Sequence, residues 1–552
     1  MKEIILKHAL ANALKYGKAD LKAVVSKVFA EAPEIKKNAR EVIEEVKKVV
    51  EEVNRMKMDE IRKKLEEIAP EMLEKRKREE KKELPPLPDA KAGKVKVRLP
   101  PEPNGYLHIG HAISFALNYL YARRYEGKVV LKFEDTNPLK EKLEFYAAIM
   151  RDIRWMGIEW DELYIISEHF AEIEKAAEKL IRKGRAYVCT CGEEEIRRGR
   201  AEKREDPCRK HSKEENLELW EDMKAGERFV LRWKGDPGAD NAVMRDPTLY
   251  RVLDTIHPWT GENHVVYPTY DMANAFTDAE VGITHVLRSE EFLQRTELHQ
   301  AIIKALGMKP PVYVHYGRFE LEGTPTSKRR IRPLVEEGIV EGWDDIRLAT
   351  IMALRRRGIV PKTFFDLAIA SGPYRGKSVI EWKLLLGINR KNIDPVAPRY
   401  FVVRNPVKLK LEGPAKNARI LLHPNRPEMG FREVRTGEWV FVEREDYEKN
   451  VGKVVRLKDL YNVRIERKKA VYAGGELIKP IVHWVCDGIE GKLVIGEKLF
   501  DGERINKESL KNVKVIAERN LVKSRQDIIQ MERVGFARIE KRHPLVLVFV
   551  SD

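Results

Sequence analysis

A chain of 552 residues is too long for one compact domain, and its length predicts three or four domains. Its 104 Lys and Arg exceed its 88 Asp and Glu, and this net charge of +16 favours a polyanionic partner, since neutralising phosphates releases counterions. Four cysteines are too few for a disulfide framework, Met1–Leu21 lacks the apolar core of a signal peptide, and Leu545–Val550 is too short to span a bilayer, so we expect a soluble cytoplasmic protein with no membrane partner.

The first ninety residues predict a helical extension. Apolar residues in the segment Ile43–Ile68 recur at roughly helical spacing, with dense Glu and Lys between them. The Pro-rich run Leu84–Asp89 interrupts this pattern and predicts a linker. A charged helical extension is not expected to take part in catalysis.

After residue 93 the pattern of apolar and polar residues changes to that of an α/β domain. A strand, a helix and a second strand are expected at Lys94–Leu99, His111–Tyr125 and Lys128–Phe133. This order is a βαβ unit with parallel strands, the start of a doubly wound, Rossmann-like sheet. Ligands in such sheets lie at the carboxyl ends of the strands, so the loop 100–110 and Glu134-Asp135 should face one site.

Two further changes of pattern follow residue 343. Residues 344–397 predict helices, with a basic cluster at Arg355–Arg357. From residue 398 onward, short strands separated by Gly and Pro are typical of all-β barrels. Five of these strands are expected at Val407–Leu411, Trp439–Val442, Lys453–Leu457, Ile481–Val485 and Leu545–Val550.

Two histidines stand at the start of the first predicted helix, in the string Pro101-Glu-Pro-Asn-Gly-Tyr-Leu-His-Ile-Gly-His111. His108 and His111 are three residues apart and share a helix face, beside the unpaired amides of the first turn. Gly110 lets a phosphate or ribose approach the backbone, and imidazole N–H groups can stabilise charge developing on an α-phosphate. A lone His-x-x-His is more often a surface accident or a metal pair, but the βαβ context favours a nucleotide site.

The string Pro101–His111 resembles the HIGH signature of class I aminoacyl-tRNA synthetases, in the form shared by the glutamyl and glutaminyl enzymes. Gly323–Arg330 lies where this family carries its second, KMSKS-type signature. Ser327 and Lys328 match that signature, whereas Pro325-Thr326 depart from it.

The resemblance extends from about Val95 to the C-terminus and implies a domain order. It consists of a helical extension (1–90), a Rossmann-like catalytic domain (91–343) with an acceptor-binding insert (about 165–245), a helical stem-contact region (344–397) and a β-barrel anticodon-binding region (398–552). Because the last region has β patterning and no helical cage, the resemblance is nearest to the archaeal and eukaryotic type of glutamyl enzyme.

This resemblance implies catalytic roles for His108, His111 and Lys328, with Lys328 bringing a mobile cation to the triphosphate in the transition state. The residues expected to bind ATP with its Mg²⁺ are Glu102, Asn104, Gly110, Arg318 and Ser327. No general base is required, because the substrate carboxylate is already a nucleophile. The alternative reading of Ser327–Arg330 is a basic loop that only touches the RNA backbone.

The family resemblance also implies a glutamate pocket. Its expected residues are Arg98, Glu134, Tyr270, Asn274 and Arg288. The guanidinium of Arg98 can bind a carboxylate, and the carboxylate of Glu134 can bind an α-ammonium. Arg288 occupies the position that separates glutamate users from glutamine users, since glutamine would leave the guanidinium desolvated without a counter-charge, a cost of about 2–5 kcal/mol.

Three of the four cysteines fall within one short segment. Cys189, Cys191, Cys208 and His211 form the pattern C-x-C-x16-C-x2-H, which offers three thiolates and an imidazole for a tetrahedral structural zinc. The alternative is a chance cluster of free cysteines. Cys486 stands alone after a predicted strand and is expected in a core.

The expected substrates are L-glutamate, ATP and tRNA(Glu), and the sequence leaves open whether tRNA(Gln) is charged as well. A glutaminyl enzyme is the nearest rival, and Arg288 argues against it. A synthetase-like enzyme acting on a modified tRNA base would lack the region after 398, and a cofactor-forming nucleotidyltransferase is usually one small domain. A catalytically silent RNA-binding scaffold conflicts with intact His108, His111 and Lys328. The scarcity of glutamine, which occurs four times, fits adaptation to heat.

Overall fold

The computed structural model describes residues 2–32, 35, 38–56, 58–69, 83–376 and 378–552. The chain forms two compact units, the first ending at Glu83 and the second running from Leu84 to Asp552. None of the helices in these ranges is long and apolar enough to cross a bilayer.

The first unit is helical, as the sequence predicts. Its helices in the described residues are α1 (Lys2–Tyr16), α2 (Leu21–Glu31), α3 (Ala39–Arg55) and α4 (Met58–Ile68). Helix α3 buries five valines on one face, and they join a hydrophobic core with Ile5 of α1 and Leu65 of α4. Asp20 caps α2 by accepting a hydrogen bond from the amide of Ala23 at 2.9 Å.

The run Leu84–Asp89 is not the linker that the sequence predicts. Leu84 and Leu87 are buried in the core of the second unit. The proline carbonyls of this run accept hydrogen bonds from the unit, including one at 2.9 Å from the hydroxyl of Tyr121 to Pro85. Prolines break a helix but leave their carbonyls and apolar rings available, so the segment packs onto the sheet domain and does not connect it loosely.

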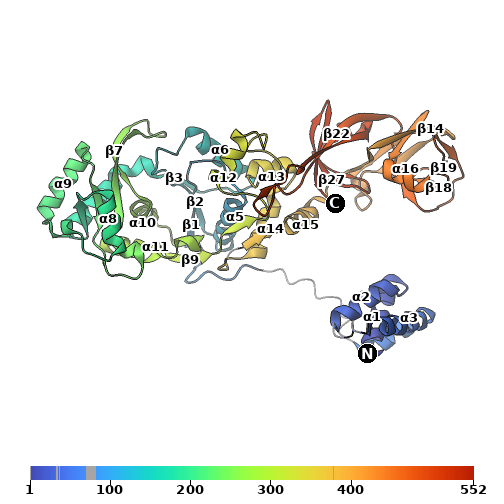
Figure 1. The fold of residues 1–552 in the computed structure, drawn as a ribbon, viewed down its shortest axis with the longest axis horizontal. Coiled ribbons are helices and arrows are strands. Elements are labelled where there is room, and N and C mark those ends of the chain that lie inside the picture. Colours follow the sequence, from blue (N-terminus) through green and yellow to red (C-terminus); the bar gives the residue numbers. More distant parts are fainter. Residues whose placement is uncertain (1, 33–34, 36–37, 57, 70–82, 377) are drawn as a thin grey trace. The chain divides into compact units, whose positions relative to one another are not determined.

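The second unit is built on a parallel sheet (Figure 1). Strands β1 (Lys96–Leu99), β2 (Lys128–Phe133) and β3 (Glu162–Ile165) pair in parallel, with α5 (Ile109–Arg124) as the first crossover, and β8 (His285–Ser289) pairs in parallel with β9 (Val312–Tyr316). Thr284, just before β8, donates its amide to Lys96 of β1 at 2.9 Å. The order is therefore β3-β2-β1-β8-β9, and it reverses between β1 and β8, which is where doubly wound sheets bind ligands.

An insert separates the two halves of this sheet. Its four-stranded antiparallel sheet consists of β4 (Ala186–Cys189), β5 (Val230–Trp233), β6 (Thr248–Ile256) and β7 (Asn263–Pro268). Helices α7 (Phe170–Arg182), α8 (Glu193–Ala201) and α9 (Lys213–Ala225) belong to it, and the chain then continues into α10 (Tyr270–Glu280) and α11 (Arg295–Ala305). Figure 1 shows this insert in green beside α10 and α11.

The helical region and the β-rich end agree with the sequence. Helices α13 (Ile351–Arg357), α14 (Pro361–Ser371) and α15 (Trp382–Ile393) follow the second half of the sheet. A seven-stranded sheet contains β12 (Arg399–Tyr400), β26 (Ile528–Met531), β27 (Gly535–Arg542), β28 (Leu545–Ser551), β22 (Gly488–Gly496), β25 (Leu510–Glu518) and β13 (Val402–Arg404). A six-stranded sheet contains β17 (Trp439–Glu443), β14 (Pro406–Glu412), β20 (Lys469–Tyr472), β19 (Asn462–Ile465), β18 (Val454–Leu457) and β21 (Ile481–Val482). Each of the five strands predicted above overlaps one of these.

Candidate active site and metal-binding cluster

His108 and His111 shape the start of α5. His108 is the N-cap, and its Nδ1 accepts the amide of Gly110 at 3.1 Å, while Nδ1 of His111 accepts the amide of His108 at 3.2 Å. This capping explains why the helix begins at Ile109, two residues before the predicted start. With both Nδ1 atoms acting as acceptors, each neutral ring carries its proton on Nε2.

The electrostatics keep both rings neutral. Burial lowers the pKa of His111 to about 3, and the nearby cations Lys328 and Arg318 add to this shift. Burial and the adjacent His111 hold the pKa of His108 well below its ordinary value. At neutral pH the site therefore offers two imidazole N–H donors beside the free amides at the positive end of a helix.

Lys328 lies directly on the loop that carries the histidines. A Cβ placed on Gly105 would lie 2.6 Å from Cε of Lys328, so the two segments are in close contact and a larger residue at 105 would displace the end of this side chain. Burial lowers the pKa of Lys328 to about 8, opposed by the carboxylate of Glu102. The structure thus joins the two signature segments, which lie more than 200 residues apart in the sequence. Gly110 is more strictly confined, because a Cβ there would lie 2.9 Å from the backbone carbonyl of Phe319.

The segment around Lys328 also contacts the β-rich end of the chain. Lys328 begins α12 (Lys328–Glu336), and β23 (Phe500–Asp501) lies against the turn that precedes this helix. The amide of Phe500 donates to the carbonyl of Gly323 at 3.1 Å, and the guanidinium of Arg330 lies 5.3 Å from the Phe500 ring centroid. The position of the lysine loop therefore depends on a strand that no sequence pattern around Lys328 indicates.

The other residues expected at the ATP site differ in their burial and in their hydrogen-bond partners. Oδ1 of Asn104 is buried without a hydrogen-bond partner in the described structure. Glu102 is exposed and acts electrostatically on Lys328. Arg318 is 45% exposed and pairs with Glu320 at 3.3 Å and Glu291 at 3.7 Å, so an ATP-bound role would exchange these contacts. Ser327 is the N-cap of α12 and makes no side-chain capping hydrogen bond.

A buried charge network lies where the glutamate pocket is predicted. The guanidinium of Arg98, 1% exposed, is 3.4 Å from Asp278 and donates to the carbonyl of Leu287 at 3.2 Å. Lys132, fully buried, forms an ion pair with Asp278 and donates to Oδ1 of Asn274 at 2.8 Å. Burial raises the pKa of Asp278, but the two cations outweigh it and the pKa lies below its ordinary value. Arg98 thus already has a carboxylate partner from the chain itself.

Glu134, directly after β2, is an acid of this pocket that forms no ion pair within the described residues. Its amide donates to the carbonyl of Pro101 at 3.0 Å, which joins the pocket to the histidine loop. Its Oε1 is buried without a hydrogen-bond partner in the described structure. Burial raises the pKa of Glu134 to about 7, although Lys132 and Arg98 oppose the shift.

Arg288, at the end of β8, is the unpaired cation. It is 4% exposed and is held by neutral acceptors. These acceptors are Nδ1 of His299 (3.4 Å), Nε2 of His315 (3.4 Å), Oγ1 of Thr296 (3.0 Å) and the carbonyl of Phe292 (3.1 Å). Within the described residues it forms no ion pair with a carboxylate, so its charge is uncompensated.

Two of these acceptors are histidines, and both are uncharged. Burial and Arg288 lower the pKa of His315 to about 4. Burial also lowers the pKa of His299, whose Nε2 donates to Asp271 at 3.0 Å and leaves Nδ1 free to accept from Arg288. The phenol of Tyr270 is near the same charges, because burial and then Glu134 raise its pKa while Arg288 opposes the shift.

Sequence reasoning missed Lys132, Asp278, His299 and His315. The signal for Lys132 was a single charge inside the apolar strand Val129–Phe133, since a lysine is almost never fully buried unless it is paired. The other three had no local signal, because their importance depends on partners from other strands and helices.

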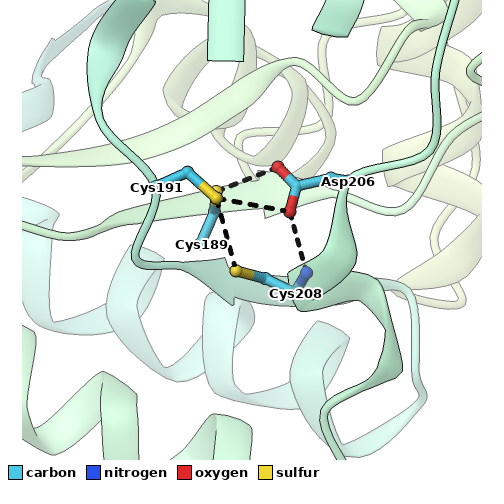
Figure 2. A group of neighbouring side chains, drawn as sticks. All are labelled: Cys189, Cys191, Asp206 and Cys208. Carbon is cyan, nitrogen blue, oxygen red and sulfur yellow. Dashed lines mark hydrogen bonds between the residues drawn. The ribbon is translucent and has the colours of Figure 1, made fainter. Parts of the chain in front are cut away.

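The three clustered cysteines come together, with a different fourth residue from the predicted one. Figure 2 shows Cys189, Cys191, Asp206 and Cys208 around one point, and their ligand atoms all lie within 4.8 Å of one another. His211 is not part of this group, and its Nδ1 is buried without a partner in the described structure.

The donor set fits a structural zinc. The sulfurs of Cys191 and Cys208 are 3.8 Å apart, and Cys189 Sγ is 3.0 Å from an oxygen of Asp206. Zn–S bonds of about 2.3 Å in a tetrahedron place sulfurs about 3.8 Å apart. Asp206 reaches the group because it caps the short helix containing Cys208, whose amide it accepts at 2.9 Å.

Comparison with known proteins agrees with this geometry. A family model described as the catalytic domain of the class I (E and Q) tRNA synthetases matches residues 94–395, and two models of their anticodon-binding domains match 397–483 and 481–540. The chain is 38% identical to a glutamate–tRNA ligase of Korarchaeum cryptofilum over 100% of both chains. It is 39% identical to the enzyme of that name from Pyrococcus furiosus, over 98% of this chain and 97% of the relative. For the Thermococcus kodakarensis glutamate–tRNA ligase the identity is 40%, over 100% and 99%. The chain therefore belongs to the class I tRNA synthetases of the glutamate and glutamine type.

Proposed function

We propose that the chain is a cytoplasmic enzyme that uses ATP to activate L-glutamate and attaches it to the 3′ end of tRNA(Glu). The curated relatives that match its full length are glutamate–tRNA ligases. The observation that carries the choice of glutamate is Arg288, a buried guanidinium whose four hydrogen-bond acceptors are neutral. A side-chain carboxylate supplies the missing counter-charge, whereas a side-chain amide leaves the cation desolvated.

The same reasoning assigns the other end of the amino acid. The α-ammonium needs an acceptor, and Glu134 offers a buried carboxylate oxygen without a partner. Arg98 is paired to Asp278, so we assign it the role of holding this acid, and the lysine bound to it, in place beneath the pocket. Tyr270 and Asn274 line the same region from α10, next to Glu134 and Lys132.

Activation then needs positioning and charge stabilisation. An oxygen of the α-carboxylate of glutamate attacks the α-phosphorus of ATP and displaces pyrophosphate. The Nε2–H groups of His108 and His111 donate to the oxygens on which charge develops, and Lys328 neutralises the triphosphate. A ribose hydroxyl at the 3′ end of the tRNA next attacks the adenylate carbonyl, and AMP leaves.

Parallel charging of purified tRNA isoacceptors with labelled glutamate and glutamine tests this function. Glutamate should be preferred by at least about 10²-fold in kcat/KM, which corresponds to about 2.7 kcal/mol. An arm with tRNA(Gln) establishes whether that tRNA is a second substrate. Wild-type enzyme that charges glutamine as well as glutamate would rule out the assignment.

Glutamate affinity should depend on the ionisation of Glu134. An ammonium binds the carboxylate form, and the pKa of this group is about 7 in the free protein. Below that pH a proton must be released on binding, so the glutamate Kd should fall by about tenfold per pH unit as the pH rises, and level off above it. Calorimetry without ATP keeps Lys328 out of the titration. A Glu134→Gln variant should bind more weakly and lose the slope; a slope that persists in it would assign the proton to another group.

We propose that Cys189, Cys191, Asp206 and Cys208 hold a structural zinc that joins the end of β4 to the short helix following α8, within the insert. Protein purified without chelator should contain about one zinc per chain. Asp206→Ala should lose the metal, whereas His211→Ala should keep it, as measured by metal analysis. Chelation should lower the melting temperature of the insert more than that of the sheet domain. Absence of zinc would remove the proposal, and loss of zinc in His211→Ala alone would return the imidazole to the ligand set.

A further inference from the structure

The protonation of one acceptor of Arg288 is fixed from behind the pocket. His299 lies on α11 and is fully buried, and its Nδ1 is 3.4 Å from Nη1 of Arg288. Because a guanidinium only donates hydrogen bonds, Nδ1 must be the unprotonated nitrogen of the ring. The proton of the neutral imidazole is therefore on Nε2, and this nitrogen lies 3.0 Å from Oδ1 of Asp271.

Asp271, the second residue of α10, accepts hydrogen bonds from two donors. Its Oδ1 accepts from Nε2–H of His299, and its Oδ2 accepts from Nη1 of Arg295. Arg295 and His299 are four residues apart on α11, so one face of this helix presents both donors to the carboxylate. Burial raises the pKa of Asp271, but His299 and Arg295 outweigh it and the pKa lies below its ordinary value. The group is therefore a carboxylate at neutral pH.

Only a carboxylate can serve both neighbours of position 271. An amide of the same size offers one acceptor and one donor. Since Arg295 can only donate, an amide at this position would turn its oxygen to Arg295 and its NH₂ group to His299. The imidazole would then accept at Nε2 and carry its proton on Nδ1, where the N–H would point at the guanidinium of Arg288.

We propose that Asp271 is a positioning residue for substrate selection, which fixes the tautomer of His299 and thereby keeps the guanidinium of Arg288 in place for the side-chain carboxylate of the substrate. The inference rests on the proposed function, in which Arg288 binds that carboxylate. Asp271 acts through His299 and needs no contact with the substrate.

The first variant is Asp271→Asn, because exchanging the aspartate beside a histidine for asparagine keeps the geometry and reverses the tautomer. The ratio of kcat/KM for glutamate over glutamine should fall by about tenfold, the size of one lost hydrogen bond to a charged group. Arg295→Met is the matched control. It should stay within about twofold of wild type, because this arginine is 38% exposed and Asp271 keeps its oxygen for His299.

The double variant Asp271→Asn/Arg295→Met separates this role from a merely structural one. Without Arg295, the amide at position 271 is free to turn its oxygen back to Nε2 of His299. The double variant should therefore recover most of the discrimination that Asp271→Asn loses. The proposal is overturned if Asp271→Asn discriminates as wild type does, or if the double variant is no better than Asp271→Asn.

The tautomer gives a second readout, which needs neither amino acid nor tRNA. In full-length protein labelled with ¹⁵N-histidine, the shifts of the two ring nitrogens show which one carries the proton, and His299→Gln identifies the signals by their loss. Nε2 should be protonated in wild type, Arg295→Met and the double variant, and Nδ1 in Asp271→Asn. An unchanged tautomer in Asp271→Asn would overturn the proposal even if discrimination falls.

A His299→Asn background adds a third check, because its amide oxygen can face Arg288 without any tautomer. There Asp271→Asn should change the glutamate preference by less than about twofold, whereas an equal tenfold loss would show that Asp271 acts by another route. Wild-type enzyme without a glutamate preference would refute the proposed function together with this role. A glutamate preference that Asp271→Asn leaves unchanged would refute this role alone.

Discussion

Replacing Lys328 by Ala should lower the rate of glutamyl-adenylate formation by about 10²–10³-fold, or about 2.7–4 kcal/mol. Charge develops on the phosphates only as the carboxylate attacks, so a positioned cation acts on the transition state more than on bound ATP. With its pKa at about 8, Lys328 is still mainly protonated at neutral pH, and a bound triphosphate favours that form further. The ATP dissociation constant should therefore change much less than the rate.

The measurement is single-turnover activation with tRNA present, since the family resemblance implies that glutamate activation requires it. His111→Ala should show a loss of similar size, because it removes a donor at the same phosphate. Arg329→Ala, an exposed neighbour on α12, is the matched control and should affect only tRNA binding. If Lys328→Ala activates glutamate at a near wild-type rate, the segment is a clamp on the RNA backbone.

Replacing Arg288 by Cys should remove most glutamate charging, by about 10²-fold or more in kcat/KM, and should relax the exclusion of glutamine. The loss corresponds to a buried carboxylate left without its cation, at about 2–5 kcal/mol. The effect should fall mainly on the KM for glutamate, because the interaction exists before the chemical step as well as during it. The assay is charging of tRNA(Glu) with glutamate and glutamine in parallel.

Arg288→Lys separates charge from geometry. Lysine keeps the positive charge but cannot reach four fixed acceptors with one ammonium, so it should recover part of the glutamate preference and only part of the lost glutamate affinity. Melting temperatures of both variants test for unfolding. That of Arg288→Cys should stay near the wild-type value, since removing an uncompensated buried cation offsets the lost hydrogen bonds. An Arg288→Cys enzyme with unchanged discrimination would show that another residue chooses the substrate.

Much of the architecture follows from the sequence because its signals are local. Alternation in β1, the apolar run in β2, the Pro and Gly turn before His108, and the short strands after residue 398 each depend on neighbours a few residues away. The histidine pair is likewise local, because a helix start needs only its own first turn to position both rings. The family resemblance added the expected roles of Lys328 and Arg288, which no local sequence pattern indicates.

The tertiary structure decided which partners those residues have. Sequence spacing suggested His211 as a zinc ligand, but Asp206 joins the cysteines because a short helix turns its carboxylate toward them. Arg98 is expected to meet substrate, and the structure adds a partner that the sequence did not indicate, Asp278, 180 residues away. Ion pairs, hydrogen bonds and close contacts of this kind depend on how strands and helices distant in the sequence pack together. The sequence by itself therefore determined the elements and the signature residues, whereas only the packing decided which charges are compensated and which, like Arg288 and Glu134, have no ion-pair partner within the described residues.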